Sequence, residues 1–283
     1  MRRLILIAVA GGTLALVPAA APHDTTAKPT GTIVYSHRFW PRDSRIVDNE
    51  ELFIKTLGGG PSVRLTRSPR CNDVFPSWSP EGRWVAFACG WGPSAGIYVI
   101  GADGRGRWPA VKVPNRRIEG TAWSPDGRKI AFGARGIWIV NAAGGGLRRL
   151  TRGDDSSPTW SRNSRSIAYE HAGDVFLMRA DGTGHRRLVR RADSPAWSPD
   201  GRRIVFLRGL DIWIMDADGG GQHRLRCCRP AGVADVEWSP DSGYLAYDGG
   251  SGIDAGIHVM PVEGTRGRFV AGGEEVQGFA WTR

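Results

Sequence analysis

The sequence has few of the features on which membrane anchors and common cofactor sites depend. Its N-terminal apolar run, residues 4–17, is shorter than the roughly 20 residues of a membrane-spanning helix. The six histidines show no short metal-ligand spacing, and no phosphate-binding Gly-Lys-Ser/Thr loop occurs. We therefore expect no transmembrane anchor, no histidine metal site and no cofactor.

The N terminus resembles a secretory signal peptide. Arg2 and Arg3 precede the apolar run, and residues 18–21, Pro-Ala-Ala-Ala, form a small-residue cleavage pattern. No cysteine follows the run at this point, which disfavours a lipid anchor. We expect a signal peptide over 1–21, a short segment over 22–30 and one folded domain over 31–283. The protein is then periplasmic or extracellular.

Lysine is scarce, and the basic character comes from arginine. The chain carries a formal net charge of +10, which permits contact with anionic lipid, polysaccharide or nucleic acid. The arginines recur at equivalent turn positions, however, and do not form one block with interleaved aromatic residues. We interpret them as solvated turn residues and expect no nucleic-acid partner.

A repeat organises the whole chain. The segment Trp-Ser-Pro-Asp/Glu-Gly-Arg begins at Trp78, Trp123 and Trp197, and weaker copies begin at Trp160 and Trp238. Trp281 starts a last copy that stops at the C terminus. Successive tryptophans are 37 to 45 residues apart, a period typical of four-stranded propeller blades.

Each copy is consistent with four antiparallel strands joined by hairpins. A strand ends at the tryptophan, a Pro-Asp-Gly turn follows, and alternating apolar segments such as 129–132 and 136–140 come next. Residues 31–36 match the second strand of a repeat and lack a first strand, which residues 277–281 supply. The sequence therefore predicts an all-β, six-bladed β-propeller in which the C-terminal strand completes blade one. We expect a monomer.

These tryptophan repeats resemble the WD40-like (PD40) repeats of the TolB-like propeller family, over about residues 31–283. The resemblance concerns the propeller domain only. It implies an exported protein that receives a cell-envelope protein or peptide at the mouth of the propeller. Related repeats also occur in the propellers of prolyl oligopeptidases and of some polysaccharide lyases, so the repeat indicates the fold more strongly than the function.

An acidic residue lies three to six positions before every repeat tryptophan. In a propeller these positions surround one end of the central channel, so six carboxylates are predicted to ring a mouth that binds a cationic partner segment or a metal ion. The alternative is that they cap local turns or pair with arginines. The six residues are Asp73, Glu119, Asp155, Asp193, Asp235 and Glu275.

Four cysteines in an exported chain favour disulfides. Cys71 precedes the first strand of blade two and Cys89 ends its second strand, so both are expected on one face and we predict that they pair. Cys227 and Cys228 are adjacent, and a bond between them would be strained. They remain candidates for free thiols or a labile vicinal disulfide.

No complete catalytic set is visible, and we expect no enzyme. Ser94 lies in a Gly-Pro-Ser-Ala-Gly segment whose sequence matches the nucleophile-elbow motif. The motif requires a turn between a strand and a helix, whereas this segment is expected to form a hairpin loop. The long insert with His37, Arg38, Trp40 and Arg42 either covers the mouth or is a plain surface loop. The leading interpretation is a protein- or peptide-binding scaffold. The alternative is a propeller lyase or hydrolase acting on an acidic glycan, for which the residues to inspect are Arg135, His171 and Arg208.

Overall fold

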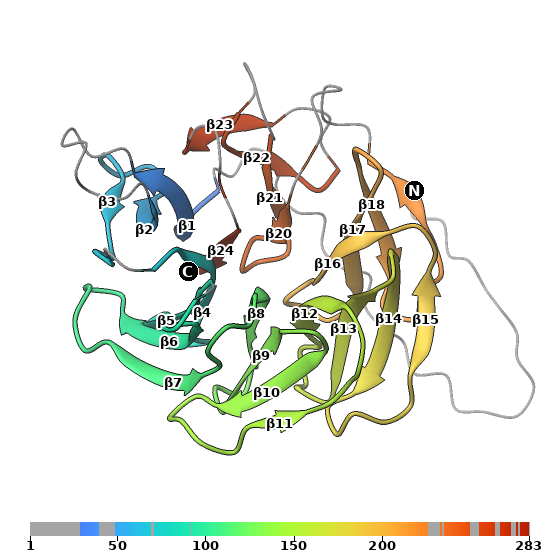
Figure 1. Cartoon of the computed structure of the whole chain (residues 1–283). Coiled ribbons are helices and arrows are strands. Elements are labelled where there is room, and N and C mark those ends of the chain that lie inside the picture. Colours follow the sequence, from blue (N-terminus) through green and yellow to red (C-terminus); the bar gives the residue numbers. More distant parts are fainter. Residues whose placement is uncertain are drawn as a thin grey trace, which may run out of the picture.

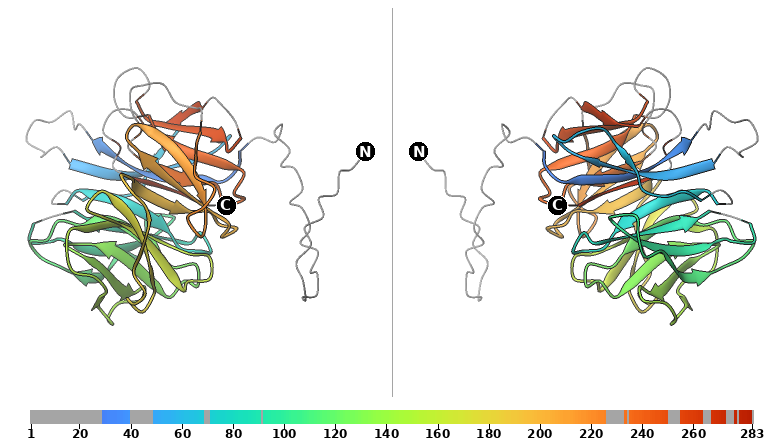
Figure 2. Two further views of the ribbon diagram at one scale, coloured as in Figure 1. Left: turned by 90° about the vertical axis from the view of Figure 1, so that its right-hand side faces the viewer. Right: turned by 90° about the vertical axis from the view of Figure 1, so that its left-hand side faces the viewer.

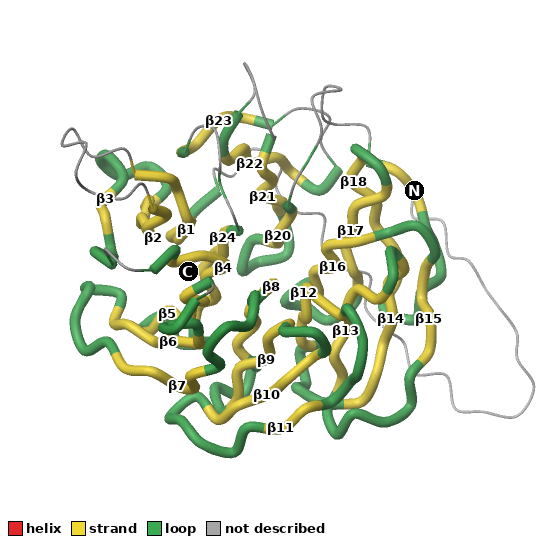
Figure 3. The backbone as a smooth tube through the Cα atoms, in the orientation of Figure 1, coloured by secondary structure: helices red, strands yellow, loops and turns green. Residues whose placement is uncertain are grey.

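The protein is a ring of six β-sheets around a central axis (Figure 1). The computed structural model describes residues 29–39, 49–68, 71–90, 92–225, 233, 235–249, 255–263, 267–272, 276 and 278–282. In this part of the chain all regular secondary structure is β-strand, as Figure 3 shows by colour. The predicted signal peptide lies outside the described residues.

Each sheet has four antiparallel strands and forms one blade. From the axis outward, blade one is β24 (Phe279–Thr282), β1 (Thr32–Phe39), β2 (Asn49–Thr56) and β3 (Val63–Arg64). Blade two is β4 (Asp73–Trp78), β5 (Trp84–Cys89), β6 (Gly96–Gly101) and β7 (Trp108–Lys112). Blade three is β8 (Glu119–Trp123), β9 (Lys129–Gly133), β10 (Ile137–Asn141) and β11 (Arg148–Arg149).

The remaining blades repeat this order. Blade four is β12 (Asp155–Trp160), β13 (Ser166–His171), β14 (Asp174–Arg179) and β15 (Arg186–Val189). Blade five is β16 (Asp193–Trp197), β17 (Arg203–Arg208), β18 (Asp211–Asp216) and β19 (His223–Arg224). Blade six is β20 (Val236–Trp238), β21 (Tyr244–Asp248), β22 (Ile257–Pro261) and β23 (Arg268–Ala271).

The two ends of the described chain close the ring within blade one. Strand β24 pairs antiparallel with β1, with Trp281 opposite Ile33 and Phe279 opposite Tyr35. The side views of Figure 2 show this blade between blades two and six. Both the six-bladed prediction and the closure by the C-terminal strand are confirmed.

The Trp-Ser-Pro-Asp-Gly repeat forms the turn between the first and second strands. In blade three, Ser124 Oγ accepts a hydrogen bond from the Lys129 amide at 2.9 Å and lies 2.6 Å from Asp126 Oδ1. Asp126 Oδ1 in turn accepts the Arg128 amide at 3.0 Å. Gly127 has φ +75°, a conformation that favours glycine. The serine, aspartate and glycine of the repeat are thus explained by the geometry of this turn.

The hydrophobic core lies between neighbouring sheets. Blades two and three, for example, enclose the fully buried Ile97, Ile130 and Phe132. The repeat tryptophans add hydrogen bonds between blades, because the indole Nε1 of Trp160 donates to the Ala122 carbonyl at 3.1 Å and that of Trp238 to the Ala196 carbonyl at 3.0 Å.

Within the described ranges, no helical segment has the length and apolar character required to cross a bilayer.

Candidate functional site

The innermost strands of all six blades surround a central channel that contains a cavity of about 700 Å³. In blades two to six the cavity extends along the inner strand to the proline or arginine of the following turn, including Pro80, Arg162 and Pro240. We call the face carrying these turns the turn face. The opposite face, where the inner strands begin, is called the top face.

Two rings of equivalent residues form the channel wall, and every member lines the cavity. One ring is the residue directly before each repeat tryptophan: Ser77, Ala122, Thr159, Ala196, Glu237 and Ala280. The other is two residues earlier: Phe75, Gly120, Ser157, Ser194, Asp235 and Gly278. Alanine alternates with a polar residue in the first ring, and blade six contributes a carboxylate to both.

The second ring departs from regular strand geometry. Phe75, Ser157 and Ser194 have positive φ angles of 51°, 49° and 47°, which is uncommon for residues with a Cβ. Each lies where the pairing of its inner strand with the second strand shifts register. These β-bulges turn the chain at the channel wall, and such outliers cluster at functional sites.

Asp235 and Glu237 give one side of the channel an acidic character. Burial raises the pKa of Asp235 to about 7, and the nearby Asp248 carboxylate acts in the same direction. Burial raises the pKa of Glu237 to about 8, with Asp235 adding to the shift. Arg162 is the one basic residue in the described lining. A cationic group entering the channel would favour the charged forms of these carboxylates.

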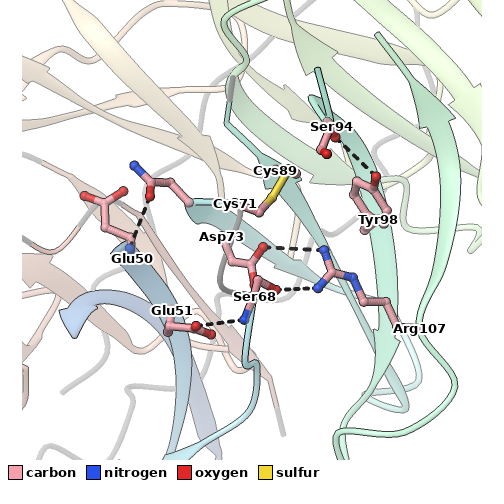
Figure 4. The surroundings of a disulfide bond; sticks show 10 residues. Glu50, Glu51, Ser68, Cys71, Asp73, Cys89, Ser94, Tyr98 and Arg107 are labelled. Atoms are coloured by element: carbon pink, nitrogen blue, oxygen red, sulfur yellow. Dashed lines mark hydrogen bonds and ion pairs between the residues drawn. A yellow bond between two sulfur atoms is a disulfide. The ribbon is translucent and has the colours of Figure 1, made fainter. Parts of the chain in front are cut away.

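Two residues of the predicted acidic ring are enclosed within the protein. Asp73, at the start of β4, is fully buried, and burial raises its pKa to about 7. Its Oδ1 lies 3.7 Å from Arg107 Nη2, and a dashed line in Figure 4 marks this ion pair. Asp155, at the start of β12, is 3% exposed and lies 2.5 Å from His171 Nδ1. Both carboxylates are therefore enclosed by the protein and are not exposed at the mouth of the channel.

Three other members of the predicted ring interact electrostatically across blades three to six. Glu119 is half-exposed and lies 3.1 Å from Arg117 Nε. Burial raises the pKa of Glu170, and the carboxylates of Asp193 and Glu119 contribute to the same shift. Asp193 also acts on Asp235. Glu119 and Asp193 lie at the start of inner strands, on the top face, and Asp235 lines the channel cavity. Glu275 lies outside the described residues.

Cys71 and Cys89 are joined by a disulfide, the pair expected from the sequence, with their Cα atoms 5.4 Å apart (Figure 4). The bond links the residues leading into β4 to the end of β5, where Asp73 pairs with Cys89. It therefore fixes the start of an inner strand beside a buried ion pair. Cys227 and Cys228 lie outside the described residues.

Glu170 and Glu237 were not predicted as site residues. Glu237 occupies the position before a repeat tryptophan, so an alignment of the repeats would have revealed a carboxylate where the other blades have serine, threonine or alanine. Glu170 lies in a second strand and has no equivalent carboxylate signal in the repeat. Only the ring geometry places it near Asp193.

None of the residues considered for an enzyme belongs to the described lining of the channel cavity. His171 contacts Asp155, and the Arg208 guanidinium lies 4.6 Å from the ring centroid of Trp213. Arg135 is exposed and has φ +51°. Ser94 lies in the loop between β5 and β6, where its carbonyl accepts the Tyr98 hydroxyl at 3.2 Å.

The long insert of blade one is described only in part. His37 and Arg38 belong to β1, and His37 Nδ1 lies 2.6 Å from the Arg38 carbonyl. Trp40 and Arg42 lie outside the described residues. Across the described part, no group of three histidine, cysteine or acidic side chains is arranged to hold a metal ion.

No family model matches the chain, but several solved structures share its fold. TolB from Acinetobacter baumannii aligns with a TM-score of 0.74 at 17% identity, over 89% of this chain and 66% of that chain. A putative TolB from Agrobacterium tumefaciens aligns with a TM-score of 0.64 at 19% identity, over 89% and 92% of the two chains.

A third structure, an oligogalacturonate lyase in complex with manganese, aligns with a TM-score of 0.57 at 14% identity. That match covers 79% of this chain and 71% of the lyase. Both TolB structures align with higher TM-scores than the lyase does. The chain therefore has the six-bladed fold of TolB-like propellers.

Proposed function

We propose that this chain is an exported, non-enzymatic binding scaffold of the cell envelope that receives a basic segment of a protein or peptide in its channel. The observation that carries the proposal is the pair of carboxylates, Asp235 and Glu237, facing a cavity of about 700 Å³ with one basic residue in its described lining. Volumes of this size accommodate small ligands or a few side chains.

Electrostatics supports a cationic partner segment. The carboxylates of Asp193 and Glu119 add to the raised pKa of Glu170, and that of Asp193 adds to the raised pKa of Asp235. A lysine or arginine would favour their charged forms. The protein as a whole is basic, with a formal net charge of +10, so the acidic channel is a local site of opposite sign.

The exported location is supported by the signal-like N terminus and by the disulfide, because disulfides persist in oxidising compartments. Secretion of the full chain, followed by mass analysis of the processed protein, tests this part. Cleavage after Ala21 is expected. A retained, unprocessed chain would contradict it.

Partner binding is tested by capture from an envelope extract, with the processed protein as bait. The D235N/E237Q bait should lose the partner that the wild type captures. E81Q/E263Q is the matched control, because it removes two exposed carboxylates outside the channel lining. If the channel variant captures the same proteins as the control, the proposed site is wrong.

A polysaccharide lyase or hydrolase is the alternative, favoured by the likeness to the oligogalacturonate lyase. Incubation with oligogalacturonate and manganese, followed by the absorbance of the unsaturated product, tests it. Turnover would overturn the non-enzymatic proposal.

A further inference from the structure

Three outer strands begin with closely related five-residue segments. Blade three has Arg-Arg-Leu-Thr-Arg over 148–152, and blade four has Arg-Arg-Leu-Val-Arg over 186–190. Blade one has Val-Arg-Leu-Thr-Arg over 63–67. The strand pairing places Val63, Arg148 and Arg186 at equivalent positions, opposite Ile54, Ile139 and Leu177. Blade one thus has an aliphatic residue where the others have arginine.

In blades three and four this first arginine binds the next blade. The Arg148 guanidinium donates to the carbonyls of Ala180 and Asp181, at 3.2 and 3.4 Å. Arg186 Nη1 donates to the Asp218 carbonyl at 3.1 Å. The accepting carbonyls belong to the Ala-Asp-Gly turn between the third and fourth strands of the neighbouring blade. The fold therefore contains two guanidinium sites built from backbone carbonyls.

Blade two presents the same turn to blade one, as Ala102-Asp103-Gly104. A Cβ on Gly104 would lie 3.3 Å from the Leu65 carbonyl oxygen, and one on Gly182 would lie 3.3 Å from the Leu150 carbonyl oxygen. The equivalent leucine and turn thus approach each other equally closely at both junctions, so the carbonyls of Ala102 and Asp103 are positioned like those that bind Arg148.

At the junction of blades one and two, no side chain of the described residues donates a hydrogen bond to these carbonyls. Val63 is 66% exposed, and a groove of about 650 Å³ lies beside it. Within the described part of the chain, neither the Ala102 nor the Asp103 carbonyl accepts a backbone hydrogen bond outside regular strands or one from a side chain. Apolar side chains flank the groove, namely Ile54, Val63, Leu65 and Ile100.

Arginines next to the groove do not prevent a cation from binding there. Arg64 is neutralised by Glu51, with Nη2 and Oε1 2.9 Å apart, and Arg107 lies near Asp73. Blade three has arginines at the positions of Arg64 and Arg67, and Arg148 nevertheless binds its carbonyls there. The flanking charges are therefore compatible with a guanidinium in this setting.

We propose that the groove between blades one and two binds an arginine side chain of a partner protein, whose guanidinium takes the position that Arg148 and Arg186 occupy at their junctions. The partner's residues beside that arginine pack on the apolar flanks. The groove exceeds the volume of a single side chain, which favours a peptide segment over free arginine. This site is separate from the channel.

The test is a titration with the capped peptide acetyl-Leu-Arg-Leu-amide, monitored by backbone amide NMR. We expect shifts at Val63 and at 102–104. In V63R the new guanidinium should donate to the carbonyls of Ala102 and Asp103 in place of the peptide's arginine. The affinity for the peptide should then fall about tenfold or more, as loss of a charge-assisted hydrogen bond implies. R148A should gain a corresponding response at 180–182.

Three comparisons make the result decisive. The citrulline peptide, which keeps the shape but lacks the charge, should bind at least about tenfold more weakly, and so should free arginine, which lacks the apolar neighbours. Equal binding of either would overturn the proposal, as would an unchanged response in V63R or no gain in R148A. Stronger shifts with inorganic phosphate would identify an anion site instead. An unchanged unfolding midpoint or an increase in V63R verifies its fold.

Discussion

His171 Nδ1 lies 2.5 Å from the buried carboxylate of Asp155, at the register point where β12 and β13 begin their pairing. The other carboxylate oxygen accepts the Thr151 hydroxyl. Thr151 Oγ1 itself accepts the Ile137 amide at 2.7 Å. One carboxylate thus joins the end of blade three to the start of blade four.

Removing this carboxylate should destabilise the ring. D155A leaves the buried Thr151 hydroxyl and the His171 imidazole without their acceptor, and we expect the free energy of unfolding to fall by about 1–3 kcal/mol. H171A should cost less, because that side chain is 45% exposed and water can replace it. Urea denaturation measures both. Equal losses would show that the carboxylate contributes no more than its imidazole partner.

The channel carboxylates predict a stability that decreases as pH rises. The pKa of Asp235 is raised to about 7 and that of Glu237 to about 8 by burial, so the folded protein holds protons that the unfolded chain releases near pH 4. The stabilisation is complete below the unfolded pKa values and is lost as pH rises through the folded ones. Each group contributes at most about 1.4 kcal/mol per pH unit within its window.

Urea denaturation between pH 5 and 8 measures this slope. D235N/E237Q should flatten it, while E81Q/E263Q should keep the wild-type slope. Some slope remains in the channel variant, because burial also raises the pKa of Asp73 to about 7. A channel variant as pH-dependent as the control would show that these two carboxylates are already ionised in the folded protein.

Most of the fold was predictable because the repeat encodes it locally. Each Trp-Ser-Pro-Asp-Gly copy specifies its own turn through the serine and aspartate contacts, as Ser124 and Asp126 show. The sequence at Thr32 lacked a preceding first strand, and the sequence at Trp281 supplied one, so the closure was predictable as well. The residues of the repeated turn and the number of strands at the two ends of the chain were therefore sufficient to predict the blades and the closure of the ring.

The site was less predictable because exposure depends on packing between blades. Asp73 and Asp155, five residues before their repeat tryptophans, are buried, whereas Glu119 and Asp193, four residues before theirs, are partly exposed. Their partners, such as Arg107 and Thr151, lie outside the inner strands, and the spacing of the repeat does not identify these contacts. Glu237 reaches the channel because it directly precedes a tryptophan, a position whose exposure only the ring makes evident.

Loss of the disulfide should destabilise the protein. The two cysteines are 18 residues apart in sequence, and closing a loop of this size contributes roughly 3 kcal/mol by restricting the unfolded chain. C71A/C89A should therefore lower the free energy of unfolding by about that amount, as measured by urea denaturation. Treatment of the wild type with a reductant should produce a similar loss. If reduction leaves the wild type unchanged, the bond does not stabilise this junction.

The repeat tryptophans predict two classes of response to replacement by phenylalanine. The indole Nε1 of Trp160 donates to the Ala122 carbonyl at 3.1 Å, whereas those of Trp123 and Trp197 are buried without a hydrogen-bond partner in the described part of the chain. W160F loses a bond between blades. W123F removes an unsatisfied donor, which is costly to keep buried.

We therefore expect W160F to lower the free energy of unfolding by about 1 kcal/mol more than W123F, and W197F to behave like W123F. Urea denaturation of the three variants at one pH measures the difference. W238F is the second test of the bonded class, since Trp238 Nε1 donates to Ala196 at 3.0 Å. If all four variants lose the same stability, packing of the rings alone holds neighbouring blades together, and the indole hydrogen bonds contribute nothing measurable.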